Sequence, residues 1–194
     1  MHSLTRIAVL AVTLLVVGCA HQINISTPLD ALVATQVSQI NKTVGYYISA
    51  EDRTKMVITL GGGGDRVKYL PYQESEPALN QVLSNLFTKV VAIPSLEDKQ
   101  FITSNEIAFI FVPSIATDSS SESTFTWPPT RFTVTLDCEA VDPAGATVWQ
   151  RRVKGEAKAE WSELLQDSSL SARRASKEAF LNLQREINAA RAFR

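Results

Sequence analysis

Two cysteines and two histidines are the side chains of this 194-residue chain from which nucleophilic or metal-dependent chemistry would be built. Both histidines, His2 and His21, lie near the amino end, so residues 22–194 contain no imidazole. A Ser-His-Asp or Cys-His arrangement is therefore not expected. One cysteine and one histidine also supply too few ligands for a zinc or iron site. We expect no catalytic residue, no metal and no cofactor, and we interpret the chain as a non-enzyme.

A hydrolase that uses carboxylates alone is the remaining enzymatic alternative. Asp137 and Glu139 lie two residues apart, on one face of a strand predicted over residues 132–141. We interpret both as solvated charges. Cys138 belongs to the opposite face, and we expect it to be buried because it alternates there with the apolar residues Phe132, Val134 and Leu136.

The glycine run at residues 61–64, closed by Asp65, has the composition of a phosphate-binding loop. It lacks the Gly-Lys-Ser/Thr ending of such loops, and strand-like residues follow it where a phosphate site would need a helix amino terminus. We therefore predict a turn between two short strands, or a loop that contacts a partner.

Cys19 is the residue whose neighbours predict a chemical modification. Arg6 precedes an apolar run from Ile7 to Val17, which is shorter than the roughly 20 residues that a membrane-spanning helix requires. Gly18 then places a small residue directly before the cysteine. This layout is typical of an export signal that is removed from the mature protein.

The ending Leu-Val-Val-Gly-Cys at residues 15–19 resembles the lipobox of bacterial lipoproteins. The resemblance implies that residues 1–18 are a lipoprotein signal peptide and that Cys19 is lipidated and becomes the first mature residue. The lipid would then hold the protein on a membrane. Ala20, and not an aspartate, follows the cysteine. By the sorting pattern of Gram-negative lipoproteins, this implies the outer membrane, with the protein facing the periplasm.

The charge balance argues against a nucleic-acid partner. The chain has 19 Lys and Arg against 20 Asp and Glu, a net charge of −1, and no polybasic block.

Residues 44–194 are long enough for a single domain with a hydrophobic core. Residues 19–43 are predicted to form the lipidated N-terminus and a tether. Within them, Thr27 and Pro28 suit the start of a short helix, and an extended course is the alternative.

Hydrophobic patterning predicts the secondary structure of the domain. Strands are expected at residues 44–48, 55–60 and 66–70, with a single helical turn from Ser49. The clearest helix is predicted over residues 75–91, with Ser75 as its cap and an apolar stripe formed by Leu79, Val82, Leu83, Leu86, Phe87 and Val90.

The second half of the chain is predicted to form strands followed by a helix. Residues 107–112 are a continuous apolar run, and residues 132–141 and 147–159 flank the turn sequence Asp-Pro-Ala-Gly at 142–145. Residues 171–191 carry a second long apolar stripe at helical spacing. The order predicts an α+β fold, with a mostly antiparallel sheet and two main helices packed on one face.

Residues 117–129 form the segment most suited to contact a partner. A polar, Ser-rich stretch is followed by Phe125, Trp127 and Pro128, which we take as candidate partner-binding residues. The alternative is that the two aromatic side chains fold back onto the edge of the sheet.

The lipobox, this element order and the strand residues Val148 and Trp149 together resemble the small outer-membrane lipoproteins of Gram-negative bacteria. The nearest is the YajG-like group, with a weaker likeness to LptE and to the curli and Pel exporter lipoproteins. The resemblance implies two partners: a membrane, through the lipid on Cys19, and an envelope protein. We expect a non-catalytic accessory or structural component of an envelope complex. The alternative is a carrier that holds a lipid or small apolar ligand between the sheet and the helix at 75–91.

Overall fold

The computed structural model describes residues 20–33, 39–122 and 127–194. The larger of its two sheets has the strand order β5-β2-β6-β7-β8. These strands are β2 (Ile40–Tyr46), β5 (Phe87–Ala92), β6 (Ile107–Ser120), β7 (Arg131–Val141) and β8 (Thr147–Lys158). β6, β7 and β8 are antiparallel, whereas β2 is parallel to both of its neighbours. The α+β class is confirmed, and the sheet is mixed rather than purely antiparallel.

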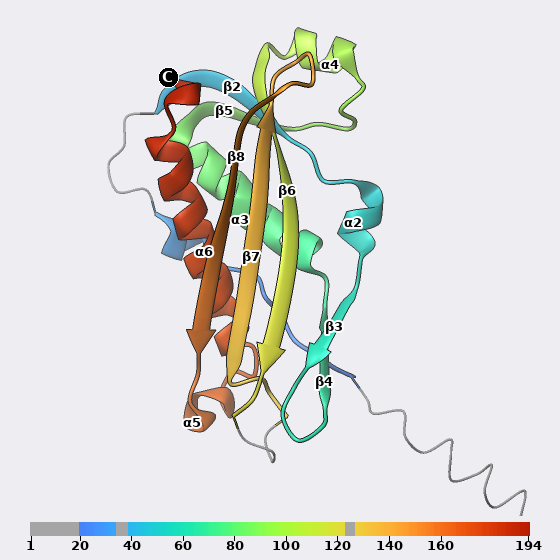
Figure 1. Ribbon diagram of the computed structural model, residues 1–194, viewed down its shortest axis with the longest axis vertical. Helices are drawn as coiled ribbons and strands as arrows, with labels where there is room; N and C mark the ends of the chain where they lie inside the picture. Colours follow the sequence, from blue (N-terminus) through green and yellow to red (C-terminus); the bar gives the residue numbers. More distant parts are fainter. Residues whose placement is uncertain (1–19, 34–38, 123–126) are drawn as a thin grey trace, which may run out of the picture.

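A smaller sheet contains β1 (Ala20–Gln22), β4 (Arg66–Tyr69) and β3 (Val57–Leu60), in that order. β1 is parallel to β4, and β3 is antiparallel to it. Figure 1 shows β3 and β4 beside the lower end of the long strands. The Tyr69 hydroxyl joins the two sheets by donating a 2.7 Å hydrogen bond to Thr117 Oγ1 on β6.

Two long helices, α3 (Pro71–Leu86) and α6 (Leu170–Ala189), pack on one face of the larger sheet, as predicted (Figure 1). They bury their apolar stripes against it, and the buried residues include Leu79, Val82, Leu83, Ala175, Ala179, Phe180 and Leu183. The other face of β6–β8 is turned toward the viewer in Figure 1. Below the level of α4 (Lys99–Ser104), no helix from the described part of the chain lies over that face.

Short elements complete the described chain. α2 (Ala50–Thr54) begins where the Ser49 side chain accepts a 3.0 Å hydrogen bond from the Asp52 amide, so the predicted helical turn is confirmed. The others are η1 (Leu29–Leu32), α5 (Trp161–Leu164) and η2 (Arg191–Phe193). η2 places the Phe193 ring inside an aromatic cluster.

The turn between β7 and β8 forms as its sequence predicts. Asp142 Oδ1 accepts hydrogen bonds from the amides of Ala144 and Ala146, both at 2.9 Å. Gly145 adopts φ +93°, a conformation that side chains with a Cβ rarely occupy. The residue types at 142–145 therefore fix the hairpin and, with it, the register of the two strands.

The helix predicted over residues 75–91 is wrong at both ends. α3 starts at Pro71, so Ser75 is a buried residue of the second turn and not a cap. α3 ends at Leu86, and the residues that follow, among them Phe87 and Val90, form β5 and pair with β2. The β-branched residues Thr88, Val90 and Val91 favour a strand, although their spacing also fits a helical stripe.

The segment expected as a tether contains packed structure. Ile23, Ile25 and Leu32 are fully buried in the main core, and β1 belongs to the smaller sheet. Residues 34–38 lie outside the described part of the chain. Packed structure is thus present from Ala20 onward, because apolar residues of this segment complete the core between the sheet and the helices.

Candidate functional site

The amino-terminal end of the described chain is fixed to the body by backbone and side-chain hydrogen bonds. β1 pairs with β4 from Ala20 onward, and the Ile23 amide donates to the Lys68 carbonyl at 3.1 Å. The Ile25 amide then donates to Glu74 Oε2 on α3 at 2.7 Å. Cys19 itself lies outside the described residues. A group attached to Cys19 would therefore be one peptide unit away from a paired strand, with almost no slack between them.

Trp127 lies at this same end of the molecule. Its ring stacks on the imidazole of His21 with 4.3 Å between centroids, and it packs on the main core while remaining half-buried. His21 Nε2 in turn lies 3.9 Å from Asp65 Oδ2. Aromatic pairs of this kind contribute on the order of 1 kcal/mol beyond burial. Trp127 therefore joins the segment before β7 to β1.

The glycine run packs against the Trp127 backbone. The Gly62 amide donates a 3.0 Å hydrogen bond to the Trp127 carbonyl. A Cβ added at Gly61 would overlap this same carbonyl oxygen, which explains why glycine stands at that position. The run is therefore a turn between β3 and β4 that leaves room for Trp127, in agreement with the first of its two predicted roles.

The three candidate partner-binding residues have different environments. Trp127 is half-buried in the stack with His21, and Pro128 is buried. Phe125 lies outside the described residues. Pro129 is also buried, and its carbonyl accepts a 2.6 Å hydrogen bond from the Ser171 hydroxyl at the start of α6. The structure thus brings Trp127 to the amino-terminal end and uses the two prolines for packing.

Cys138 is buried in the main core, as predicted. Burial, together with the neighbouring acids Asp137 and Glu139, raises the pKa of its thiol to about 12. A thiol in this environment is protonated at neutral pH and is a poor nucleophile.

The carboxylates on the outer face of β7 are paired with neighbouring side chains. Asp137 accepts hydrogen bonds from Arg152 at 2.6 Å and from Gln150 at 3.0 Å, and these contacts lower its pKa. Glu139 accepts a hydrogen bond from the Thr147 hydroxyl. A carboxyl group with a lowered pKa stays ionised and is unsuited to act as a general acid near neutral pH.

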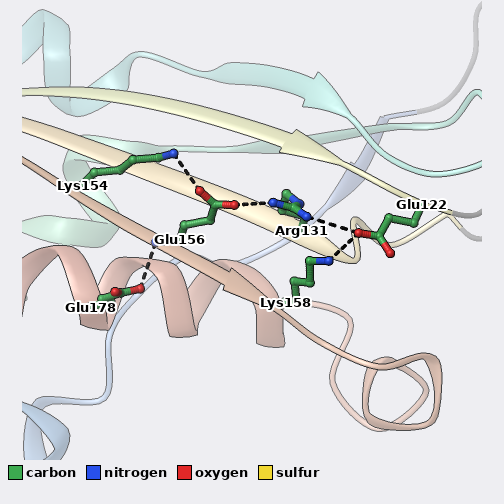
Figure 2. Close-up of polar contacts among 6 residues, drawn as sticks. All are labelled: Glu122, Arg131, Lys154, Glu156, Lys158 and Glu178. Carbon is green, nitrogen blue, oxygen red and sulfur yellow. Dashed lines mark hydrogen bonds and ion pairs between the residues drawn. The ribbon is translucent and has the colours of Figure 1, made fainter.

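A second network lies on the same outer face near the ends of the strands. Figure 2 shows Arg131 between Glu156 and Glu122, with Lys154 on Glu156 at 2.7 Å and Lys158 on Glu122 at 2.5 Å. The cationic neighbours lower the pKa values of both glutamates. These side chains are solvent-exposed, so the network contributes little to stability and mainly gives the face alternating charge.

The outer edge of β8 is covered by α6. Three side chains from one face of the helix bond to backbone groups that point away from β7, a protection that discourages pairing with another strand. The contacts are Arg174 to the Lys158 carbonyl at 3.2 Å, the Glu156 amide to Glu178 at 3.0 Å (Figure 2) and Asn182 to the Lys154 carbonyl at 2.7 Å.

The space between the sheet and the two long helices is filled. Ser75 and Leu79 from α3 meet Phe180 and Leu183 from α6 there, and the gap that they line with residues of β6 and β7 has no room for a water molecule. A larger hollow of about 730 Å³ lies outside, between the start of β8 and the end of α6. It is open and carries the exposed Arg151–Glu186 ion pair at 3.5 Å.

No helix in residues 20–33, 39–122 and 127–194 has the length and apolar character to cross a bilayer. Over these same residues, acidic, histidine and cysteine side chains do not gather in groups of three that would hold a metal ion.

No protein-family model and no curated protein matches this chain in sequence. Solved structures with a similar arrangement include a protein of the DUF330 family from Xanthomonas campestris, at 10% identity and a TM-score of 0.45, which covers 87% of this chain and 90% of that one. A PelC dodecamer from Paraburkholderia phytofirmans has 9% identity and a TM-score of 0.43, with 78% and 92% covered. A candidate lipoprotein from Caulobacter crescentus has 15% identity and a TM-score of 0.38, with 82% and 91% covered. At this level of similarity, no residue role is carried over to this chain.

Proposed function

We propose that this protein is an outer-membrane lipoprotein, held by a lipid on Cys19 and facing the periplasm, and that it acts as a non-catalytic accessory component of an envelope complex. The observation that carries the proposal is the position of the lipobox cysteine directly before a paired strand. A lipid at this position would hold the body close to the membrane in a fixed orientation. A fixed orientation suits a component that must present one surface to a neighbour.

The outer face of β6–β8 is the surface that we propose for the neighbour. Its β6 side carries small residues such as Ser114 and Ala116, which register with Asp137 and Thr135 on β7. Its β8 side carries the paired charges of Figure 2. A flat surface of small residues and balanced charge suits a polar protein interface, in which charge pairs set the register of the partner. Phe125 and Trp127 remain candidate contact residues.

The carrier alternative receives no support from the described residues. A lipid or small apolar ligand would need a cavity of several hundred Å³ between α3 and the sheet. Side chains fill that space, and the buried Leu79 and Phe180 line the small gap that is left. Such a ligand would have to separate α3 from α6 before it could bind.

Site-specific photocrosslinking in intact cells tests the accessory role. A photoreactive amino acid is placed at Ala116 on the outer face, at Phe125, and at Arg185 on the exposed side of α6 as the matched control. We expect a discrete crosslinked product from Ala116 or Phe125, and none from Arg185. Equal products from all three positions, or no product from the first two, would contradict the proposed function.

A further inference from the structure

The outer face of the smaller sheet carries large apolar side chains in solvent. Met56, Ile58 and Leu60, which we name the apolar strip, are 54%, 52% and 63% exposed. They alternate along β3 and the residue before it, whereas Val57 and Thr59 between them are half-buried. Because β3 is an edge strand of the smaller sheet, a strip of this kind is an aggregation hazard unless something covers it.

Basic side chains flank the apolar strip. Lys68 registers with Ile58, and Arg66 registers with Leu60, so these cations lie beside the strip on the same face. Lys55 precedes Met56 in the chain. Within the described residues, none of the three cations has a carboxylate within 4.0 Å. The face is thus apolar at its edge and carries unpaired positive charge next to it.

The same sheet also holds the start of the folded body. Ala20 registers with Arg66 and Gln22 with Lys68, so β1 continues the face that bears the apolar strip. Cys19 is one residue before Ala20, and one residue of extended chain spans at most about 3.5 Å. A lipid on Cys19 would therefore enter the membrane within a few ångströms of this sheet.

We propose that the outer face of the β1-β4-β3 sheet lies on the phospholipid leaflet, with the apolar strip inserted at the interface and Lys55, Arg66 and Lys68 on anionic headgroups. This inference rests on the proposed lipid anchor. Apolar side chains next to cations are the composition of interfacial membrane contacts, and each cation near an anionic surface adds to the attraction. α4 and the β7–β8 turn lie at the opposite end of the long strands from β3 and β4 (Figure 1).

A fluorescent label tests this contact in the lipidated protein. The protein is purified from membranes and reconstituted into vesicles of phosphatidylethanolamine and phosphatidylglycerol, with or without bromine on the acyl chains. An environment-sensitive dye is attached through Ile58→Cys, with Ala144→Cys in the β7–β8 turn as the matched control. Both sites are exposed, and the buried Cys138 thiol does not compete for the dye. We expect blue-shifted emission and quenching by bromine at Ile58, and neither change at Ala144.

Charge reversal provides the second measurement. We expect Arg66→Glu with Lys68→Glu to reduce quenching of the dye at Ile58 in phosphatidylglycerol vesicles. Reversal of Arg185 on α6 should leave the quenching unchanged. Equal quenching in both variants would overturn the role given to the cations.

The remaining outcomes separate failure of the contact from failure of the anchor. If the protein floats with the vesicles but the dye at Ile58 is not quenched, the anchor stands and the contact is wrong. The dye at Ile58 can also be shielded from water in native outer membranes and yet not be quenched in the brominated vesicles. In that case a protein covers the apolar strip, and the proposal is overturned. If the purified protein does not float with vesicles, the proposed anchor fails and the contact fails with it.

Discussion

Gly155→Ala tests the packing that holds α6 against β8. Gly155 lies on the inner face of β8, and a Cβ added there would be 3.0 Å from the Ala179 Cα. The Ala175 carbonyl oxygen and the Ala179 amide nitrogen would be closer still. These are backbone atoms of a helix, so no side-chain rotation can relieve the overlap. Either α6 moves outward or β8 bends.

The expected loss follows from that geometry. Overpacking a core costs about 1–3 kcal/mol, and a backbone obstacle places Gly155→Ala toward the upper end. Alanine also lowers the entropy of the unfolded chain, which offsets about 0.4–1 kcal/mol of this cost. The free energy of unfolding should therefore fall by about 2 kcal/mol. For a domain of this size, the melting temperature falls by about 2–4 °C per kcal/mol, and we therefore expect a decrease of about 4–8 °C.

Thermal unfolding of the detergent-solubilised protein, followed by circular dichroism, measures this decrease. Ala116→Val is the matched control, because it adds carbon atoms to the same sheet on the exposed outer face. We expect the control to change stability by less than about 0.5 kcal/mol. An unchanged melting temperature for Gly155→Ala would refute the argument that α6 and β8 are in closest contact at this glycine.

Three further predictions address the core and its charges. Phe193→Ala should lower the free energy of unfolding by about 3–5 kcal/mol in a urea titration, because the buried ring contacts four other aromatic rings; a loss below about 1 kcal/mol would contradict its core position. Cys138 should resist thiol reagents at pH 8 until the protein unfolds, since its pKa is raised to about 12; rapid labelling of the native protein would contradict its burial. Arg53 lowers the pKa of Glu76, so the ion pair stabilises the fold above about pH 4, and this contribution is lost as the pH falls through the lowered pKa. Glu76→Gln should therefore be less stable than the unmodified protein at pH 7 and equally stable at low pH, and a gap that persists at low pH would exclude this linkage.

Local chemistry made part of the fold predictable. The turn sequence at 142–145 specifies a hairpin through the side chain of Asp142 and the positive φ of Gly145, and both are present. The helix α6 could also be predicted, because its apolar residues recur at helical spacing over many turns. The burial of Cys138 followed from strict alternation along β7.

Long-range pairing limited the rest of the prediction. Phe87 and Val90 fit a helical stripe, but they form a strand because β5 pairs in parallel with β2. No local sequence pattern predicts this pairing. β1 has three residues and forms because β4 lies beside it. The stack of Trp127 on His21 joins residues that are distant in the sequence. Their proximity carries no sequence signal.

The apolar strip was missed for a different reason. Residues 56–60 are all apolar or threonine, so the sequence has no alternation that tells the buried face of β3 from the exposed one. The structure distinguishes them through the inward contact of Thr59, whose hydroxyl accepts a 2.6 Å hydrogen bond from Ser119 on β6. That contact turns Ile58 and Leu60 outward.

The intact mass of the protein extracted from the outer membrane tests whether Cys19 carries the lipid anchor. We expect a chain that begins at Cys19 and carries additional mass equal to a diacylglyceryl group and an acyl chain. A chain that begins at Met1, or one cleaved elsewhere without added lipid, would show that Cys19 does not anchor the protein.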